Sequence, residues 1–445
     1  MKKILSICFG LCGVSMLLAQ EQPDYTTLKA QLKEEILREL HQKDSLEKAQ
    51  SSNLLSWDRF SFSGYGAVNY YKYGTYDTDL DIKDKIDVER LNLYLGYRFN
   101  NWISMRSEVE FEHGGTGATM ELDILEESGE FEQEIEAGGE VKLEQLYLDF
   151  QLRPYFNVRA GRVKLRTNLA QLLDRPTSYF TTHKPEMENE ILPLGWYENG
   201  VQFYGTFAKR FRYELSITNG LDATGFSTRN WIKKGHQVRF EMANAETPAL
   251  SGRIDYLFGK SKHTFVGIGG YINNAAPNRP KSDIDKSAYV TLFTAHLSYD
   301  EGPLRFNTAF VFGNLENSDV VTRANRGLSK GLGVKRNVIG KQALGLSAEL
   351  GYEVLSLTNY TGDPFVRYDY YDTMHAVEGY VIKQDRWERK AFTTGVNWFI
   401  IPQILVKAQY QWRRLGGEHY HLITKLPIGR GAQENTFSLG VAFSF

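Results

Sequence analysis

The sequence predicts an all-β fold: a 16-stranded antiparallel transmembrane β-barrel preceded by a short N-terminal periplasmic helix or coiled coil. Three observations support this prediction. Apolar and polar residues alternate with period two from Trp57 onward, short and long connections alternate between the strands, and the chain ends in an aromatic strand. We therefore expect a signal peptide at residues 1–20, a periplasmic helix and linker at 21–56, and an outer-membrane barrel at 57–445.

The first twenty residues have the pattern of a secretory signal peptide. Lys2 and Lys3 precede an apolar run that ends before the small residue Ala19. This run is about 15 residues long, which is shorter than the roughly 20 residues that a membrane-spanning helix needs. Both cysteines, Cys8 and Cys12, lie inside it. The exported chain is then expected to contain no cysteine, which excludes disulfides, thiol metal sites and thiol nucleophiles.

Residues 24–50 predict an amphipathic helix, because four aliphatic residues fall on one helical stripe among Lys, Glu and Gln: Leu28, Leu32, Ile36 and Leu40. A helix this short cannot bury such a stripe alone, so a periplasmic coiled coil is the favoured interpretation. The alternative is a charged, partly helical tether. No later apolar stretch is long enough for a transmembrane helix, and the net charge of -2 gives no indication of nucleic-acid binding.

Strands follow from Trp57 to the end of the chain. In residues 103–113, one face is apolar (Ile103, Met105, Val109, Phe111) and the other is charged (Arg106, Glu108, Glu110, Glu112). Seven short turns and eight long loops separate the predicted strands, which requires sixteen strands with both ends on the short-turn side. Residues 235–244 also alternate, but a further strand would reverse the loop parity. We therefore place them inside the fourth long loop.

The apolar face is predicted to point outward into lipid, because sixteen strands enclose a space too wide for side chains to fill. Aromatic residues recur where strands meet turns, at the depth of a membrane interface: Trp102, Tyr155, Phe156, Trp398, Phe399 and Phe445. The last strand resembles the terminal signature by which the barrel-assembly machinery recognises its substrates. The residues of this assembly signal are Phe437, Leu439, Val441, Phe443 and Phe445.

Two segments resemble the phosphate-selective porin family of O and P type outer-membrane porins. They are residues 146–164 (LYLDFQLRPYFNVRAGRVK) and residues 197–207 (YENGVQFYGTF). The resemblance implies a homotrimeric, sixteen-stranded porin in the outer membrane of a Gram-negative cell, in contact with membrane lipid and lipopolysaccharide. It also implies passive diffusion of small polar or anionic solutes, including phosphate-like anions. The loop after Lys164 lacks the proline-rich start of the family.

That loop, residues 165–198, is the expected constriction, because a long loop folded inward is the usual way to narrow a wide barrel. Basic residues in and near it, with others expected on wall strands, suit an anion-attracting ladder. The alternative is that they pair with Glu108, Glu110, Glu144 and Glu214 and neutralise the wall. The candidate pore-lining residues are Arg106, Arg159, Arg162, Lys164, Arg166, Arg175, Lys184, Arg210 and Arg212, of which Arg106, Arg210 and Arg212 are expected on wall strands.

The second long loop is acidic and has two interpretations. In the first interpretation, divalent cations bridge its carboxylates to lipopolysaccharide phosphates. In the second, the loop is only solvated. Its acids are Glu121, Asp123, Glu126, Glu127, Glu130, Glu132, Glu134 and Glu136.

No cofactor, metal centre or catalytic motif is predicted, because the nine histidines are scattered and no G-x-S-x-G elbow occurs. Two alternative functions stay open at this point. One is a barrel hydrolase of the phospholipase kind, and the other is a plugged structural or adhesive surface barrel.

Overall fold

The computed structural model describes residues 33–34, 56–74, 83–115, 121–123, 132–134, 139–193, 195–237, 242–328, 338–357, 360–416 and 433–445. The predicted signal peptide lies outside these residues. So does the predicted periplasmic helix, apart from Lys33 and Glu34, which are helical. Within the described ranges, we find no helix that is both long and apolar enough to cross a membrane.

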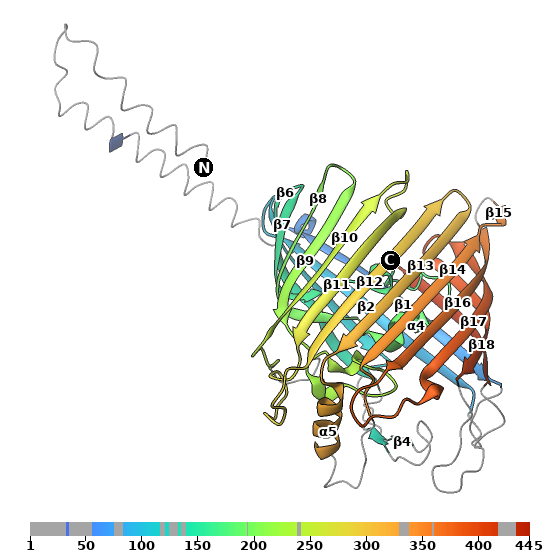
Figure 1. Ribbon diagram of the computed structural model, residues 1–445. Helices are drawn as coiled ribbons and strands as arrows, with labels where there is room; N and C mark the ends of the chain where they lie inside the picture. The colour runs from blue at the N-terminus through green and yellow to red at the C-terminus, as the bar shows by residue number, and fades with distance from the viewer. Residues whose placement is uncertain are drawn as a thin grey trace, which may run out of the picture. The chain divides into compact units, whose positions relative to one another are not determined.

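A single antiparallel sheet closes on itself to form a barrel (Figure 1). β1 (Phe60–Tyr73) pairs with β2 (Lys85–Arg98) on one side and with β19 (Gln433–Ser444), the last strand, on the other. The short β15 (Leu355–Leu357) pairs with β16 beyond the end of β14, so sixteen strands form the wall and the predicted strand number is confirmed. The other wall strands are β3 (Ile103–Glu112), β6 (Glu140–Arg153), β7 (Phe156–Lys164), β8 (Tyr197–Phe207), β9 (Phe211–Asn219), β10 (Pro248–Leu257), β11 (Phe265–Asn274), β12 (Tyr289–Glu301), β13 (Leu304–Leu315), β14 (Gln342–Tyr352), β16 (Tyr360–Ala376), β17 (Glu388–Ile401) and β18 (Ile404–Leu415).

Short turns join the strands at one end of the barrel and long loops join them at the other, as the sequence predicts. The β2–β3 turn is typical of the short-turn end: Asn100 Oδ1 accepts hydrogen bonds from the backbone N–H groups of Trp102 and Ile103, both at 2.9 Å. The long loops contain the helical segments, among them α5 at the long-loop end in Figure 1. These segments are α3 (Leu169–Leu172), α4 (Glu186–Ile191), η2 (Ala223–Gly225), η3 (Lys233–Gly235), α5 (Ser318–Leu328) and η5 (Asp385–Trp387), while η1 (Trp57–Arg59) precedes β1.

Two predictions concern particular loops. β9 and β10 pair directly, so the described part of residues 235–244 lies in the loop between them, and its placement there is confirmed. In the acidic loop, β4 (Glu121–Asp123) and β5 (Glu132–Glu134) form a separate two-stranded hairpin. The remaining acids of this loop, Glu126, Glu127, Glu130 and Glu136, lie outside the described residues.

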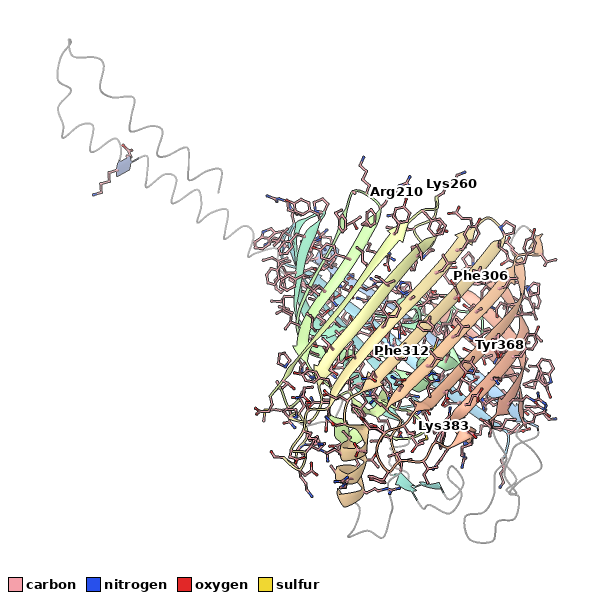
Figure 2. All side chains as sticks on the ribbon, in the orientation of Figure 1. Arg210, Lys260, Phe306, Phe312, Tyr368 and Lys383 are labelled. Carbon is pink, nitrogen blue, oxygen red and sulfur yellow. The ribbon has the colours of Figure 1, made fainter. Side chains whose placement is uncertain are left out.

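The outer face of the wall is apolar. In β11, Val266, Ile268 and Ile272 are exposed, whereas the intervening Gly267 and Gly269 point inward and are buried. Figure 2 shows Arg210 and Lys260 at the short-turn end, Lys383 at the long-loop end, and aromatic residues on the wall between them. An apolar band between two charged rims is the surface that a bilayer requires. We therefore treat the strands as membrane-spanning.

The chain terminus joins the last strand to the first. Phe445 and Gly64 exchange two backbone hydrogen bonds of 2.9 Å each. A Cβ atom added to Gly64 would lie 2.6 Å from the Phe445 ring, and one added to Gly66 would lie 2.6 Å from the Phe443 ring. Both rings therefore pack over glycine backbone at the β1–β19 seam. Phe437, Leu439 and Val441 continue the same outward face of β19.

A charge on the outer wall tests the lipid-facing assignment. Leu346 lies near the middle of β14 and its side chain is exposed. We expect Leu346→Arg to lower the free energy of unfolding in lipid vesicles by about 2–4 kcal/mol, because the guanidinium group must enter hydrocarbon. Gln403→Arg, in the exposed β17–β18 turn, is the control and is expected to change it little. Equal stabilities for the two variants would contradict an outer face in contact with lipid.

Candidate pore constriction

Residues 165–196, between β7 and β8, form a loop that crosses the interior of the barrel; we call it the inward loop. On β12, Thr294 Oγ1 donates to the Thr167 carbonyl. On β1, Asn69 Nδ2 donates to the Thr182 carbonyl at 3.2 Å. β1 and β12 lie far apart in the order of strands around the barrel, so a loop that touches both must span the lumen. The predicted inward fold of this segment agrees with its contacts.

Small residues on the inner wall make room for this loop. A Cβ atom at Gly269 of β11 would lie 2.3 Å from the Thr167 carbonyl oxygen. At Gly345 of β14, a Cβ would lie 2.5 Å from Met187. At Gly351 it would lie 2.2 Å from the Phe180 ring. Glycine allows the loop to approach the backbone of the wall this closely, and any larger residue would push it away.

The two short helices of the inward loop are tied together by its own side chains. Asn168 caps α3 by accepting from the Gln171 N–H at 3.0 Å. Glu188 of α4 accepts from the N–H groups of Leu169 and Ala170, both at 2.9 Å. Burial nevertheless raises the pKa of Glu188 to about 7. The two helices therefore form one unit whose internal bonds use the free N–H groups at the start of α3.

Glu186 connects this unit to the wall on the other side of the barrel. Its carboxylate accepts from Arg413 Nε at 2.6 Å, from the Tyr371 hydroxyl at 2.6 Å and from Gln411 Nε2 at 2.9 Å. Burial by itself favours the neutral acid, but Arg413 and these hydrogen bonds outweigh it and lower the pKa of Glu186 to about 2. Glu186 is therefore an ionised anchor.

A lysine holds the middle of the inward loop. Lys407 of β18 donates to the carbonyls of Tyr179 and Thr181, both at 2.7 Å, and its ammonium group lies 4.3 Å from the centre of the Tyr179 ring. Gln409, two residues along the same strand, accepts from the Thr182 N–H at 2.8 Å. Lys407 is only 2% exposed, so it binds the loop backbone rather than a solute.

Asp174 of the inward loop is the centre of a second charged group. Its carboxylate pairs with the ammonium groups of Lys164 and Lys184 and lies 3.9 Å from Arg90. Burial favours the neutral acid, but these three cations lower the pKa of Asp174 well below its usual range. We call these four residues the Asp174 cluster. It binds the loop to β2 and β7.

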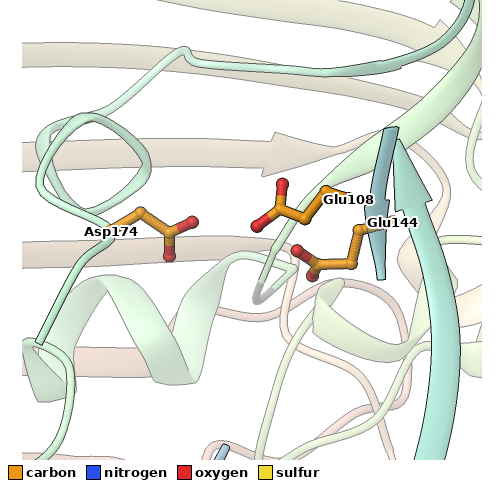
Figure 3. A group of neighbouring side chains, drawn as sticks. All are labelled: Glu108, Glu144 and Asp174. Carbon is orange, nitrogen blue, oxygen red and sulfur yellow. The ribbon is translucent and has the colours of Figure 1, made fainter. Parts of the chain in front are cut away.

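Two further carboxylates face Asp174 from the wall (Figure 3). Oxygen atoms of Glu108 on β3, Glu144 on β6 and Asp174 lie within 4.8 Å of one another. Oxygen donors of this kind suit hard divalent cations. Here, however, the positive charge next to Asp174 is supplied by Lys164 and Lys184, and Lys164 is also 3.9 Å from Glu144. The arrangement is therefore a protein ion-pair network that fixes the loop.

Three of the candidate basic residues gather on one side of the lumen. Arg159 donates to Gln202 Oε1 at 2.7 Å, and its guanidinium lies 3.9 Å from the centre of the Tyr204 ring. Arg159 and Arg166 share Glu214 of β9, with N to O distances of 3.5 and 3.4 Å. On the same strand, Arg212 donates through Nε to Asp255 at 2.9 Å.

The other candidates are dispersed. Lys164 and Lys184 belong to the Asp174 cluster, while Arg162 stacks 4.5 Å over Tyr197. Arg106 and Arg175 are exposed. The placement of Arg210 on a wall strand was wrong: it lies in the β8–β9 turn and donates to the Tyr256 hydroxyl at 3.2 Å. The preceding Ala208 and Lys209 have positive φ angles of 48° and 59°, so the turn ends only at Arg210.

Sequence reasoning missed the residues that hold the inward loop in place. Asp174 and Glu186 lie among charges of both signs in the loop, and Lys407 is one polar position of an alternating strand, so neither pattern distinguishes them. The partners of Lys407 and Glu186 lie far away in the sequence: the bonds from Lys407 to the loop join residues 228 and 226 positions apart, and Glu186 lies 227 positions from Arg413. No local pattern indicates such a pairing.

Comparison with known proteins supports the fold. No family model matches the chain. An uncharacterised protein of Aquifex aeolicus is 28% identical over 358 residues, which cover 79% of this chain and 74% of that protein. Among solved structures, the anion-selective porin of Comamonas acidovorans matches with a TM-score of 0.52 and 11% identity, over 87% of this chain and 99% of the porin. Salmonella typhi OmpF in complex with daunomycin matches with a TM-score of 0.50 and 10% identity, over 87% and 97%. The chain has the fold of sixteen-stranded outer-membrane porins.

Acid is expected to weaken the Glu186 anchor. The lowered pKa means that the ionised anchor stabilises the fold above the ordinary value of 4.5, and that this contribution is lost as the pH falls through about 2. It amounts to on the order of 3 kcal/mol. Urea unfolding in detergent micelles between pH 6 and pH 2.5 measures the loss. Glu186→Gln, which cannot ionise, should show a smaller pH dependence than the unaltered protein; identical curves would contradict the anchor.

Proposed function

We propose that the protein is an outer-membrane porin that passes small polar solutes by passive diffusion and prefers anions. The observation that supports the anion preference is an asymmetry in the ion pairs of the lumen. In five arginine pairs, the arginine side chain is more exposed than its carboxylate partner. The acids therefore lie toward the wall and the guanidinium groups toward the solvent, although the total charge is almost balanced.

The exposed fractions make this asymmetry explicit. Arg212 is 33% exposed and its partner Asp255 0%, while Arg305 is 25% exposed and Asp363 6%. The remaining pairs are Arg166 at 24% and Arg159 at 16% with Glu214 at 10%, and Arg413 at 20% with Glu186 at 6%. The order is reversed in the Asp174 cluster, where the acid is 12% exposed and Lys164 and Lys184 are 3%. It is also reversed in two buried pairs, Arg90 with Glu89 (4% and 13%) and Arg367 with Glu349 (2% and 4%). A solute therefore meets mainly guanidinium groups, which bind carboxylate and phosphate oxygens in pairs.

Only small solutes fit this proposal. Inward side chains in the middle of the wall, such as Lys407, Arg367 and Asn397, are 2%, 2% and 1% exposed. The inward loop bonds to Lys407 and lies beside Arg367, so the lumen is narrower than the interior of sixteen bare strands. The proposal assigns no catalytic step to the barrel.

The finer features implied by the family resemblance are part of the same proposal. We propose phosphate-like anions among the solutes, a homotrimer as the assembled form, and a periplasmic coiled coil formed by the N-terminal segment. We propose that the barrel-assembly machinery recognises the aromatic strand β19. We also propose that lipid and lipopolysaccharide surround the wall. The packing of Phe443 and Phe445 over β1 glycines supports a role of that strand in closing the barrel.

A plugged surface barrel is the second candidate function. It is favoured by the same near-complete burial of inward side chains, because a loop that reaches β1, β12, β16 and β18 leaves little space beside it. Steady single-channel current in planar bilayers separates the two candidates, since a permanently plugged barrel conducts no ions.

The reversal potential in a salt gradient tests the anion preference. We expect the unaltered protein to show the sign of an anion-preferring channel. Replacing Arg159, Arg166 and Arg212 together with Glu should shift the potential toward cations, because these three guanidinium groups face the lumen. Arg323→Glu changes the same charge on α5, where the side chain is 69% exposed, and serves as the control. Cation preference in the unaltered protein would refute the proposed selectivity.

A further inference from the structure

A second loop also enters the barrel, at its long-loop end. It comprises residues 220–237, follows β9 and contains η2 and η3; we call it the mouth loop. Leu221, Phe226 and Ile232 are buried in it and belong to one apolar core with Met187 and Ile191 of the inward loop. An apolar core excludes water from the part of the lumen that it occupies.

The mouth loop reaches across the opening to a distant part of the wall. The Thr373 hydroxyl of β16 donates to the Thr228 carbonyl at 2.6 Å. The Thr228 hydroxyl in turn donates to the Val338 carbonyl, shortly before β14. β10 to β14 separate β9 from β16 in the order of strands around the barrel. A loop that starts at β9 and bonds to β16 must therefore cross the mouth.

Trp231 fixes the end of this crossing. The side chain is 0% exposed, and its indole Nε1 donates to the Gly340 carbonyl at 2.9 Å. Its ring occupies the space beside Gly313 of β13, where an added Cβ would lie 2.1 Å from the ring. The backbone φ of Trp231 is 46°, a left-handed conformation that is costly for a bulky residue. Strain of this kind persists only where surrounding contacts determine the position, and it is concentrated at functional sites.

The mouth loop is also bonded to the inward loop. Asn230 Nδ2 donates to Glu190 Oε2 of α4 at 2.7 Å, and Lys233 Nζ lies 3.9 Å from Glu190 Oε1. α4 is the helix that Glu186 anchors to the wall. A movement of the mouth loop therefore acts directly on the helix that narrows the lumen.

We propose that the mouth loop is a gate, with Trp231 beside Gly313 as its closed position. Release of the ring from the glycine removes the strain at Trp231, withdraws the apolar core from the mouth and frees Glu190. The lumen then opens to the outside. This inference rests on the proposed porin function, because only a conducting barrel has a current for the gate to control.

Trp231→Ala tests the gate in planar bilayers. Without the ring, the mouth loop loses its closed position, and we expect the mean current at fixed voltage to rise severalfold. Gly313→Ala should act in the same direction, because the added methyl group displaces the ring. Trp102→Ala removes an exposed tryptophan from the short-turn end of the outer wall and is the matched control, with no change expected. Heat-dependent migration in gel electrophoresis establishes that each variant has a folded barrel.

A reversible bridge provides a second, independent measurement. The chain has two cysteines, Cys8 and Cys12, both in the predicted signal peptide, so Asn230→Cys with Glu190→Cys introduces one pair into the barrel. A short bifunctional thiol reagent should reduce the current through this variant, and cleavage of the reagent should restore it. The single Asn230→Cys variant is the control.

The outcomes distinguish the two proposals. If the unaltered protein conducts while Trp231→Ala, Gly313→Ala and the bridged variant all conduct equally well, the gate is wrong and the porin function stands. If the unaltered protein passes no current and Trp231→Ala conducts, both the porin function and the gate are supported. If no folded variant passes current, the porin function is wrong, and the gate is wrong with it.

Discussion

The closure of the sheet between β1 and β19 is the constraint on which the rest of the structure depends. In hydrocarbon, each backbone N–H and C=O group needs a partner within the protein, and only a closed sheet provides one for every strand. Sixteen strands satisfy this requirement, but they enclose a space that their own side chains cannot fill. The position and contacts of the loops inside the barrel follow from that excess of space.

Both loops that enter the barrel pack against the inner wall in the same way. Inward-facing glycines leave gaps in the inner wall, and large side chains of the loops occupy them: Met187 at Gly345, Phe180 at Gly351 and Trp231 at Gly313. In the inward loop, charged groups then fix the backbone, with the Asp174 cluster at β2 and β7 and with Lys407 and the partners of Glu186 at β16 and β18. A wall of glycines beside buried ion pairs therefore explains how long loops acquire one position inside a wide barrel.

Much of the architecture follows from local patterns. Period-two alternation predicts the strands and the outward direction of their apolar residues, and loop parity predicts their number. The length and charge of residues 165–198 indicated the constriction. The placement of Arg210 on a wall strand failed because Arg210 is the last residue of the β8–β9 turn, in which Ala208 and Lys209 have positive φ angles. The roles of Lys407 and Trp231 were missed because their partners are far away in the sequence.

The sequence by itself determined which face of each strand meets lipid, how many strands there are and which loop narrows the lumen. These properties depend on residue spacing and composition, which act over a few neighbouring positions. Only the tertiary structure decided which charges are neutralised against the wall and which face the lumen. Two basic residues on wall strands, Lys407 and Arg212, differ in this respect because of what packs over them: the inward loop covers the first and leaves the second one third exposed. That coverage is a property of the closed barrel, not of any segment.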